Sequence, residues 1–395
     1  MFSKLFLTHL KKPIIFVAGS GLIGCGTTEF LLNSEKFHSA VFPLIHQYID
    51  DEAFHCLNVQ LASWGLLPRF GQSRKEYPEL ECDFFGKRLK NPIGLAAGFD
   101  KNGEAIRSLA KLSGFGFIEI GTVTPIPEQG SPRPRLFRLI EDEGVINRCG
   151  FNNDGVGRVQ QRVKTARANW RSDFAVLGVN VGESKKEGDA KSSFEMGVNS
   201  FAPYSDYIVL NLSSPNTSGL KFKKSDLQSL LLYVKEAIDI LHLASRPKVF
   251  LKIPPDLTNH EKRDIAEVVT DLKHGVDGLI ISNTTISRPE TLKSVNKAET
   301  GELSGTPLRQ ISTECVREMY RFTGGQVSII GCGGISSGAD VYEKIRAGAS
   351  VVQLHSAIVF HGFPIIGKIK RELMELLRRD GFTNITQAIG ADHRI

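Results

Sequence analysis

Eight short apolar runs, each followed by glycine or polar residues, constrain the fold of this chain more than any other feature. They span residues 93–97, 117–123, 175–181, 207–212, 249–253, 278–282, 327–331 and 350–354. Amphipathic helical stretches such as 227–241, 261–272 and 339–347 separate most of them. Alternating strands and helices imply parallel βαβ units. Eight units over roughly 300 residues predict an α/β fold, a (β/α)8 TIM barrel with its active site at the C-terminal strand ends. A doubly wound sheet is the alternative.

Two stretches between strands, 124–174 and 283–326, are longer than a simple crossover requires. Such excursions on a barrel are usually active-site lids or additional strands. Within the first, 136–140 and 145–146 flank Glu-Asp-Glu-Gly and predict a small hairpin.

The run at 207–210 is followed by Asn211-Leu-Ser-Ser-Pro-Asn216, which carries two amide and two hydroxyl side chains around one proline. Buried polar side chains cost free energy unless a partner satisfies them. The simplest partner is a flat, hydrogen-bonding ligand that lies over the C-terminal end of this strand.

Composition indicates a globular enzyme and excludes several other classes. Hydrophobic residues make up 41% and charged residues 23% of 395 residues, which argues against disorder. The formal net charge is +6, and the basic residues are spread out rather than clustered with aromatics, so no nucleic-acid partner is expected. A mild basic excess suits an anionic ligand or an anionic membrane surface. The six cysteines form no CxxC pair and no metal-ligand spacing, so reduced intracellular thiols and no metal are expected.

Residues 1–29 form a distinct segment with the character of a targeting or anchor sequence. Lys4, Lys11 and Lys12 precede a charge-free run at 13–28, and Glu29 is the first acidic residue. Sixteen residues as a helix span about 24 Å against a hydrocarbon core of ~30 Å, which is short for a spanning helix unless flanking residues extend it. The pattern resembles an organellar presequence joined to a single membrane anchor; a secretory signal peptide is the alternative.

One motif inside this segment imitates a dinucleotide site. Gly19-Ser-Gly-Leu-Ile-Gly24 is a GxGxxG sequence behind the strand-like run at 14–17. A Rossmann site needs this motif inside a βαβ unit with an acidic residue ~20 positions further on. No second strand of the right type follows, so no dinucleotide site is expected.

Two amphipathic stretches follow, at 30–48 and 52–64. Such faces usually pack on a domain core; alternatively, they form a membrane-surface helix pair whose apolar groove admits a lipid-like molecule. The predicted organisation is therefore a targeting and anchor segment at 1–29, a small helical domain at 30–70 and a barrel domain at 71–395.

From about residue 30 to residue 394, a series of motifs resembles the dihydroorotate dehydrogenase family. The motifs are Ala96-Ala-Gly-Phe-Asp-Lys-Asn-Gly103, Glu119-Ile-Gly-Thr-Val-Thr-Pro125, Pro132-Arg-Pro-Arg-Leu-Phe-Arg138, Ile146-Asn-Arg-Cys-Gly-Phe-Asn152, 211–217 and 329–334. The helical extension, and serine rather than cysteine in the 211–216 motif, resemble the membrane-bound, quinone-linked class.

The resemblance implies an FMN enzyme that oxidises (S)-dihydroorotate to orotate, the fourth step of pyrimidine synthesis, and passes the electrons to ubiquinone. It also implies the mitochondrial inner membrane, with the catalytic domain on the intermembrane-space side. No obligate protein partner is evident.

The same resemblance assigns the substrate site. Ser214 is the expected base that takes a proton from C5 while a hydride leaves C6 for flavin N5, and Thr217 and Phe151 position and shield the proton path. Asparagine side chains offer a donor and an acceptor together, as the orotate ring requires. The implied substrate-binding residues are Lys101, Asn147, Arg148, Cys149, Gly150, Phe151, Asn211, Asn216, Asn283 and Thr284.

The resemblance also assigns the FMN site, with Lys252 near flavin N1 and a phosphate cradle formed by Gly305, Gly333, Gly334 and the amides of His355 and Ser356. Glycines there allow backbone N–H groups to approach an anion. The full set of implied FMN-binding residues is Ala96, Ala97, Gly98, Lys101, Thr122, Asn147, Asn180, Asn211, Lys252, Ser282, Gly305, Gly333, Gly334, His355 and Ser356.

A quinone tunnel is the third implied site. Its residues are His46, His55, Arg138, His355 and Val359, with Phe42, Ile45, Leu61 and Leu66 as apolar lining. Three of them depart from the family's usual pattern: His355 replaces a common tyrosine, Val359 a threonine and His46 a glutamine. These changes bear on the shape of the tunnel and on its inhibitor preference.

Two other functions are compatible with parts of the sequence. A dihydrouridine synthase, an FMN barrel acting on tRNA, would need a basic aromatic face and a cysteine acid, and neither is evident. A membrane-tethered flavin-binding module without turnover would keep the phosphate cradle but would not need Ser214 or the asparagines.

Overall fold

The computed structural model describes residues 49–67, 75–84, 86–184, 189–213 and 223–394. The anchor segment 1–29, its GxGxxG motif and the amphipathic stretch at 30–48 lie outside the described residues. So do individual residues of the expected sites, namely Phe42, Ile45, His46, Ser214, Asn216 and Thr217.

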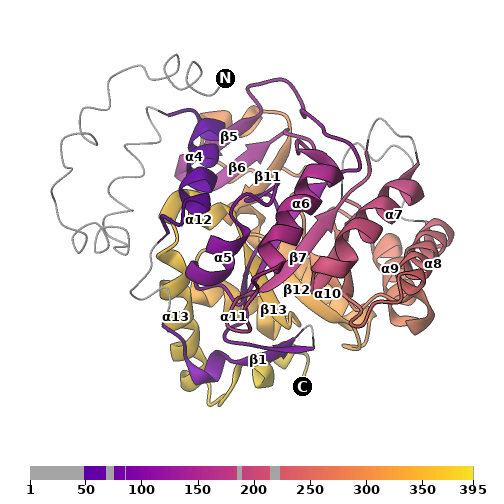
Figure 1. Ribbon diagram of the computed structural model, residues 1–395. Helices are drawn as coiled ribbons and strands as arrows, with labels where there is room; N and C mark the ends of the chain where they lie inside the picture. The colour runs from indigo at the N-terminus through magenta and orange to yellow at the C-terminus, as the bar shows by residue number, and fades with distance from the viewer. Residues whose placement is uncertain (1–48, 68–74, 85, 185–188, 214–222, 395) are drawn as a thin grey trace.

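Eight parallel strands close into a barrel, which confirms the predicted (β/α)8 fold (Figure 1). Around the barrel they are β3 (Ile93–Leu95), β4 (Phe117–Val123), β7 (Val176–Val181), β8 (Tyr207–Asn211), β9 (Lys248–Ile253), β10 (Gly278–Ile281), β12 (Ser328–Cys332) and β13 (Val351–Leu354). The last strand pairs with the first, with Val352 opposite Ile93. A doubly wound sheet, which has two open edges, is therefore wrong.

Helices cover the outside of the barrel (Figure 1). They are α5 (Ile106–Leu112), α6 (Gly155–Arg167), α7 (Ala190–Phe201), α8 (Lys224–Ile240), α9 (Asn259–Thr270), α10 (Arg309–Phe322), α11 (Gly338–Arg346) and α13 (Ile365–Arg379), with α12 (Ser356–His361) near the end of β13. The three helices predicted from periodicity are α8, α9 and α11. A capping box of Thr258 and Glu261 begins α9 two residues before the predicted start, because it satisfies the first free N–H groups.

The strands are buried on both faces, as parallel barrel strands must be. Every residue of β4, β7 and β8 is buried. The barrel interior is filled to contact: a Cβ added at Gly178 would lie 2.0 Å from the Tyr207 ring. Glycine at 178 therefore makes room for the one fully buried tyrosine ring of β8.

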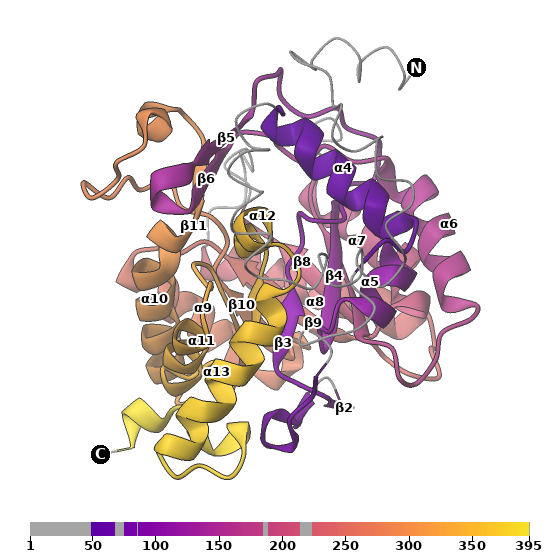
Figure 2. The ribbon, with the colours of Figure 1, turned by 90° about the vertical axis from the view of Figure 1, so that its left-hand side faces the viewer.

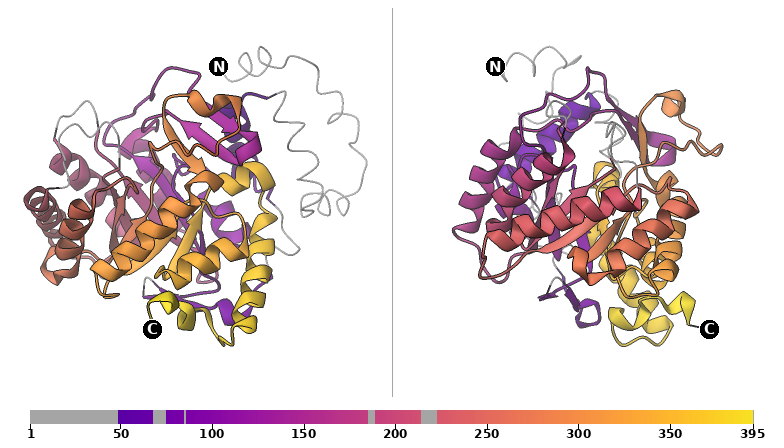
Figure 3. Two further views of the ribbon diagram at one scale, coloured as in Figure 1. Left: turned by 180° about the vertical axis from the view of Figure 1, so that it is seen from behind. Right: turned by 90° about the vertical axis from the view of Figure 1, so that its right-hand side faces the viewer.

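A second sheet of three strands lies at the C-terminal end of the barrel. The predicted hairpin is confirmed as β5 (Leu136–Leu139) and β6 (Gly144–Asn147), which pair antiparallel. β11 (Glu302–Gly305), from the second long excursion, pairs with β6. The strand was not predicted, because Leu303 is its only large apolar residue. A separate short hairpin, β1 (Cys82–Phe84) and β2 (Lys87–Leu89), was also missed. β1 and the C-terminus lie at the opposite end of the barrel (Figures 1 and 3).

The predicted helix at 52–64 is α4 (Asp51–Ser63), which lies across the same end of the barrel as the three-stranded sheet (Figure 2). Asp50 caps this helix by accepting a hydrogen bond from Ala53 N, and Phe54 is on the buried face of the helix. Glu52 accepts from Arg135 at 2.6 Å and from Arg133 at 3.0 Å, so the helix is joined to the chain before β5. Among the described residues, no helix has the length and apolar character needed to cross a membrane.

Candidate active site

A cavity of about 860 Å3 opens at the C-terminal ends of the barrel strands, where the barrel fold predicts the active site. The strand ends form its floor, and α4, the three-stranded sheet and α12 form its walls. This volume lies within the usual range for small-molecule and cofactor sites, about 300–1,000 Å3.

The cavity brings together most of the expected site residues that the structure describes. Those lining it are Ala96, Ala97, Gly98, Lys101, Thr122, Asn147, Arg148, Cys149, Gly150, Phe151, Asn211, Lys252, Ser282, Asn283, Thr284, Gly305, Gly333, Gly334, His355 and Ser356, together with His55, Arg138 and Val359 of the expected tunnel. Asn180, Leu61 and Leu66 do not line it. Residues from three separately predicted sites therefore share one cavity.

Lys252, at the end of β9, supplies a positive charge to the floor of the cavity. Its side chain is only 4% exposed, and no hydrogen bond or ion pair to its ammonium group occurs among the described residues. A buried cation without a partner is costly. The position therefore fits a ligand that presents an anion or an electron-rich ring edge.

A chain of buried hydrogen bonds orients the polar side chains of the floor. Asn211 Nδ2 donates to Thr122 Oγ1 at 3.0 Å, and Thr122 donates to Asn180 Oδ1 at 2.7 Å. Asn180 in turn donates to Glu119 at 2.8 Å, and Gln353 donates to the other Glu119 oxygen at 2.6 Å. Asn180 thus acts behind Thr122 and does not face the cavity.

Sequence reasoning missed Glu119 and Gln353. Each is a charged or amide residue inside a mostly apolar barrel strand, which the sequence already displayed. The carboxylate of Glu119, together with burial, raises the pKa of the neighbouring Tyr207 hydroxyl well above its ordinary value, with burial the larger cause.

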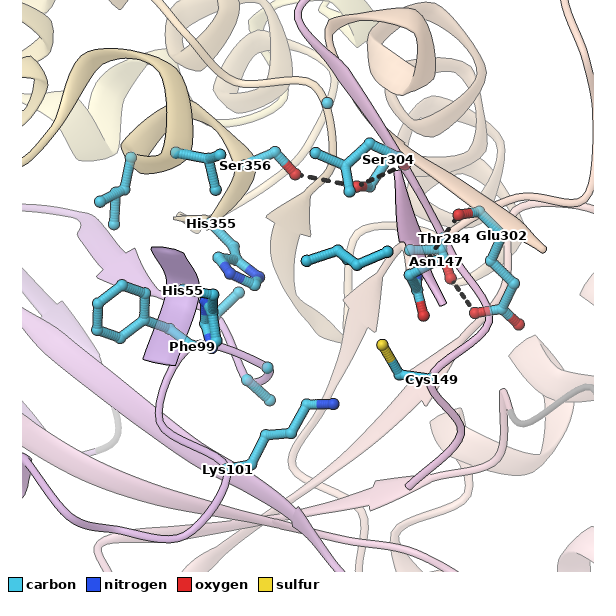
Figure 4. Close-up of a pocket in the computed structure, with 18 of the residues that line it drawn as sticks. His55, Phe99, Lys101, Asn147, Cys149, Thr284, Glu302, Ser304, His355 and Ser356 are labelled. Carbon is cyan, nitrogen blue, oxygen red and sulfur yellow. Dashed lines mark hydrogen bonds between the residues drawn. The ribbon is translucent and has the colours of Figure 1, made fainter. Parts of the chain in front are cut away.

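One side of the cavity is polar (Figure 4). Lys101 points its ammonium group into the space and is hydrogen-bonded to Asn152. Burial, the main cause, lowers the pKa of Lys101. Asn147 and Thr284 lie across from it (Figure 4), and the hydroxyl of Thr284 donates to Glu302 at 2.5 Å. Burial raises the pKa of Glu302, which no motif had indicated as a site residue.

Arg148 lies at the rim, where its guanidinium is already engaged. It pairs with Glu299 at 2.7 Å and stacks over the Phe137 ring at 4.4 Å. The neighbouring Cys149 is buried and lies beside the polar side of the cavity (Figure 4). Both residues line the cavity, but the Arg148 guanidinium is held by Glu299.

The other side of the cavity is aromatic. The His55 and His355 rings lie 5.9 Å apart, and Phe99 contacts both edge-on at 5.5 and 6.0 Å (Figure 4). Burial, the main cause, lowers the pKa of His55 to about 4 and that of His355 to about 3. Both rings are therefore neutral near pH 7.

Arg138 reaches the cavity from β5. It forms an ion pair with Asp51 and donates through Nη2 to the Ile49 carbonyl at 3.1 Å. Its buried Nη1 has no hydrogen-bond partner among the described residues. The two N–H bonds of Nη1 thus have no acceptor among the described residues, at a residue that lines the cavity.

The glycines that the sequence assigns to a phosphate cradle form a tight backbone loop. Gly333 and Gly334 have φ values of +107° and +71°, and a Cβ at Gly334 would lie 2.3 Å from the Arg309 Cα. Only glycine fits there. Ser356 lines the same cavity, with its hydroxyl 3.0 Å from that of Ser304 (Figure 4). The donor set, backbone amides and hydroxyls without a carboxylate, fits a phosphate group.

Comparison with known proteins places this geometry in a family. The Dihydroorotate dehydrogenase family matches residues 79–377. The mitochondrial dihydroorotate dehydrogenase (quinone) of Mus musculus is 46% identical over 385 residues, covering 96% of each chain. The dihydroorotate dehydrogenase (quinone) of Rhodospirillum rubrum is 46% identical over 349 residues, covering 88% of this chain and 92% of that protein.

Solved structures agree with these relatives. A crystal structure of DHODH from Eimeria tenella in complex with ferulenol superposes with a TM-score of 0.82 at 43% identity, covering 87% of this chain and 96% of that one. With a matching family over most of the barrel, and relatives of this identity along nearly the whole chain, the protein belongs to the dihydroorotate dehydrogenase family.

Proposed function

We propose that the protein oxidises dihydroorotate to orotate and passes the electrons to a quinone. The observation that carries this function is the chemical division of one cavity. Amides and Lys101 form one side, and aromatic rings form the other. A glycine loop and Lys252, whose ammonium group has no partner in the described part of the chain, lie at the strand ends between them. The quinone-linked names of the relatives support the same reaction.

We assign FMN to the centre of this cavity. Its phosphate would be held by Gly333, Gly334 and Ser356, and its ring would lie over Ala96 to Gly98, where small residues leave room. Lys252 would lie against the electron-rich edge of the ring. FMN, when bound, supplies the acceptor for the hydride that leaves C6.

The polar side would bind the substrate. Lys101 provides a cation for the dihydroorotate carboxylate, and Asn147, Asn211 and Asn283 provide paired donors and acceptors for the ring amides. Ser214, which lies outside the described residues, is proposed from its motif as the base that takes the C5 proton. Asn211, held by Thr122, begins that motif and orients its start.

The aromatic side would admit the quinone. A quinone needs an apolar channel with a few donors for its carbonyl oxygens. His55, Phe99 and His355 provide the walls, and Arg138 Nη1 provides a free N–H. Val359 lines the cavity, and His46, which lies outside the described residues, is proposed for the tunnel from the resemblance alone. Because His55 and His355 are neutral, a quinone that binds beside them does not displace water from a charged group.

The test separates the reaction into halves. Purified protein should carry FMN, which mass spectrometry identifies after denaturation. Anaerobic dihydroorotate should bleach the flavin absorbance, and a short-tailed ubiquinone should restore it. A protein whose flavin stays oxidised with excess dihydroorotate would refute the function. A flavin that bleaches but is reoxidised only by other acceptors would refute the quinone half alone.

We further propose that residues 1–29 target and anchor the protein at the mitochondrial inner membrane, with residues 30–70 as the quinone-side helical domain and 71–395 as the catalytic barrel. The named mitochondrial relatives and the basic, acid-free leader support this. Deletion of 1–29 should release the protein from membranes and leave flavin reduction intact. Loss of FMN in that truncation would instead assign the segment to the fold.

A further inference from the structure

Lys344 of α11 is a buried lysine for which the proposed reaction has no use. Its side chain is completely inaccessible to solvent. The ammonium group donates to Ser312 Oγ at 2.5 Å and to Thr313 Oγ1 at 2.8 Å, and lies 3.5 Å from the Arg309 carbonyl oxygen. All three acceptors are neutral, and no carboxylate forms an ion pair with Lys344 in the described part of the chain.

A buried, unpaired charge is unfavourable for folding. Accordingly, burial is the main cause that lowers the pKa of Lys344, to about 7. A methionine or leucine would fill the same space without this cost. The lysine therefore calls for a reason outside stability.

Ser312 connects Lys344 to the glycine cradle. Its hydroxyl lies 3.0 Å from the carbonyl oxygens of both Gly333 and Arg309. The hydroxyl has one proton to donate, and it accepts from Lys344. Because Lys344 also reaches the Arg309 carbonyl, the Gly333 carbonyl is the acceptor that depends on Ser312. The contact between α10, which carries Ser312, and α11, which carries Lys344, is visible in Figure 2.

The hydrogen bond from Ser312 to the Gly333 carbonyl sets the direction of the peptide group between Gly333 and Gly334. In a trans peptide the C=O and the next N–H point in opposite directions. With the Gly333 carbonyl turned toward Ser312, the Gly334 N–H points the other way, and both glycines line the cavity. Among the described residues no acceptor takes that N–H. The group is free for an anion.

We propose that Lys344 is a positioning residue for the phosphate of the cofactor. Through Ser312 it holds the 333–334 peptide with its N–H toward the cavity, and when protonated it places a positive potential directly behind the cradle. The inference rests on the proposed flavin function and names the phosphate, not the flavin ring, as the group that Lys344 serves. Lys344 does not line the cavity, so its action is indirect.

Riboflavin provides the test, because it shares the ring of FMN and lacks the phosphate. The holoenzyme is incubated with increasing riboflavin, unbound flavin is removed, and the bound FMN and riboflavin are quantified by chromatography. The ratio of the two dissociation constants is the phosphate selectivity of the site. General loosening of the fold weakens both flavins and leaves this ratio unchanged.

The Lys344→Met variant keeps an unbranched side chain, one heavy atom shorter than lysine, and removes the charge and the hydrogen bonds. We expect its phosphate selectivity to fall about tenfold or more, the usual scale for a lost hydrogen bond to a charged group. Lys370→Met is the matched control. Lys370 is equally buried but pairs with Glu76 at 3.0 Å and does not line the cavity. This control should lower the melting temperature and keep the parental selectivity.

If Lys344→Met does not fold, Ser312→Ala is the deciding variant. Its phosphate selectivity should fall several-fold, because the 333–334 peptide is no longer held with its N–H toward the cavity. Parental selectivity in Lys344→Met, or in Ser312→Ala when only that variant folds, overturns the inference and leaves the proposed function standing. A parent enzyme that binds FMN no better than riboflavin refutes the phosphate assignment itself, and with it the role of Lys344.

Discussion

Arg138 offers the sharpest test of the division between the substrate side and the quinone side. Its side chain is 4% exposed, and two of the guanidinium nitrogens are engaged by Asp51 and the Ile49 carbonyl. The third, Nη1, is buried without a partner among the described residues. Arg138→Ala removes this donor from the cavity.

The expected size of the effect follows from the hydrogen bond that is lost. A bond involving a charged group contributes about 1.5–3 kcal/mol, and 1.4 kcal/mol corresponds to a factor of ten. The KM for quinone should therefore rise roughly 10- to 100-fold. Flavin reduction by dihydroorotate should stay near the parental rate, because Lys101 and the asparagines are untouched.

The ion pair with Asp51 complicates this variant and also provides its control. Removing one partner of a buried pair costs about 3–5 kcal/mol. Asp51 is 21% exposed and can be partly hydrated, so about 1–3 kcal/mol is expected here. Asp51→Asn breaks the same pair and weakens the docking of α4 in the same way. Because it keeps the Arg138 donor, its quinone KM should stay within a few-fold of the parent.

Stopped-flow measurement of each half-reaction decides the outcome. Flavin bleaching is followed with anaerobic dihydroorotate, and reoxidation is followed with a short-tailed quinone after chemical reduction. The tunnel assignment is wrong if Arg138→Ala slows bleaching as much as reoxidation. It is also wrong if Asp51→Asn raises the quinone KM as far as Arg138→Ala does, because docking of α4 would then account for both effects.

The remaining predictions concern the base, the substrate amides and acid stability. Ser214→Ala should slow bleaching of bound flavin by about 10²–10⁴-fold, the usual contribution of a general base; a near-parental rate would remove Ser214 from that role. Asn283→Ala should slow bleaching by dihydroorotate and spare reoxidation by quinone, and the reverse result would move Asn283 to the other side of the flavin. The Asp206 side chain is 5% exposed, accepts a hydrogen bond from Leu177 N and forms ion pairs with Lys87 and Arg167. Burial alone would raise the pKa of Asp206, but these contacts outweigh it and the pKa is lowered. Because its folded pKa is depressed, its stabilisation is complete above the unfolded pKa of ~3.9 and is lost as pH falls through the folded pKa. Asp206→Asn should thus lower the free energy of unfolding by about 1–3 kcal/mol at pH 7, and urea titrations should show the gap to the parent closing in acid; a gap that is constant from pH 7 to pH 3 contradicts the assignment.

The parts of this protein that could be predicted from the sequence are those that a local pattern encodes. Continuous apolar runs predict buried parallel strands, and all eight runs became barrel strands. The hairpin of β5 and β6 was visible because its strands and turn are adjacent in the chain. Many candidate site residues were also predictable, because parallel barrel strands bring their C-terminal ends to one place and the motifs follow those ends.

Tertiary structure alone decided which distant groups meet. Gln353 and Glu119 are 234 positions apart in the chain and are hydrogen-bonded inside the barrel. β11 forms a strand by pairing with β6, which comes from a distant part of the chain. In the folded chain Asn180 lies behind Thr122 and accepts a hydrogen bond from it, and Thr284 donates to Glu302. Lys344 donates to Ser312 and so lies behind the glycine cradle. A sequence records which side chains are present and how nearby ones repeat. Direction, burial and the partner of each polar group depend on contacts between segments far apart in the chain, and these exist only once the barrel has closed.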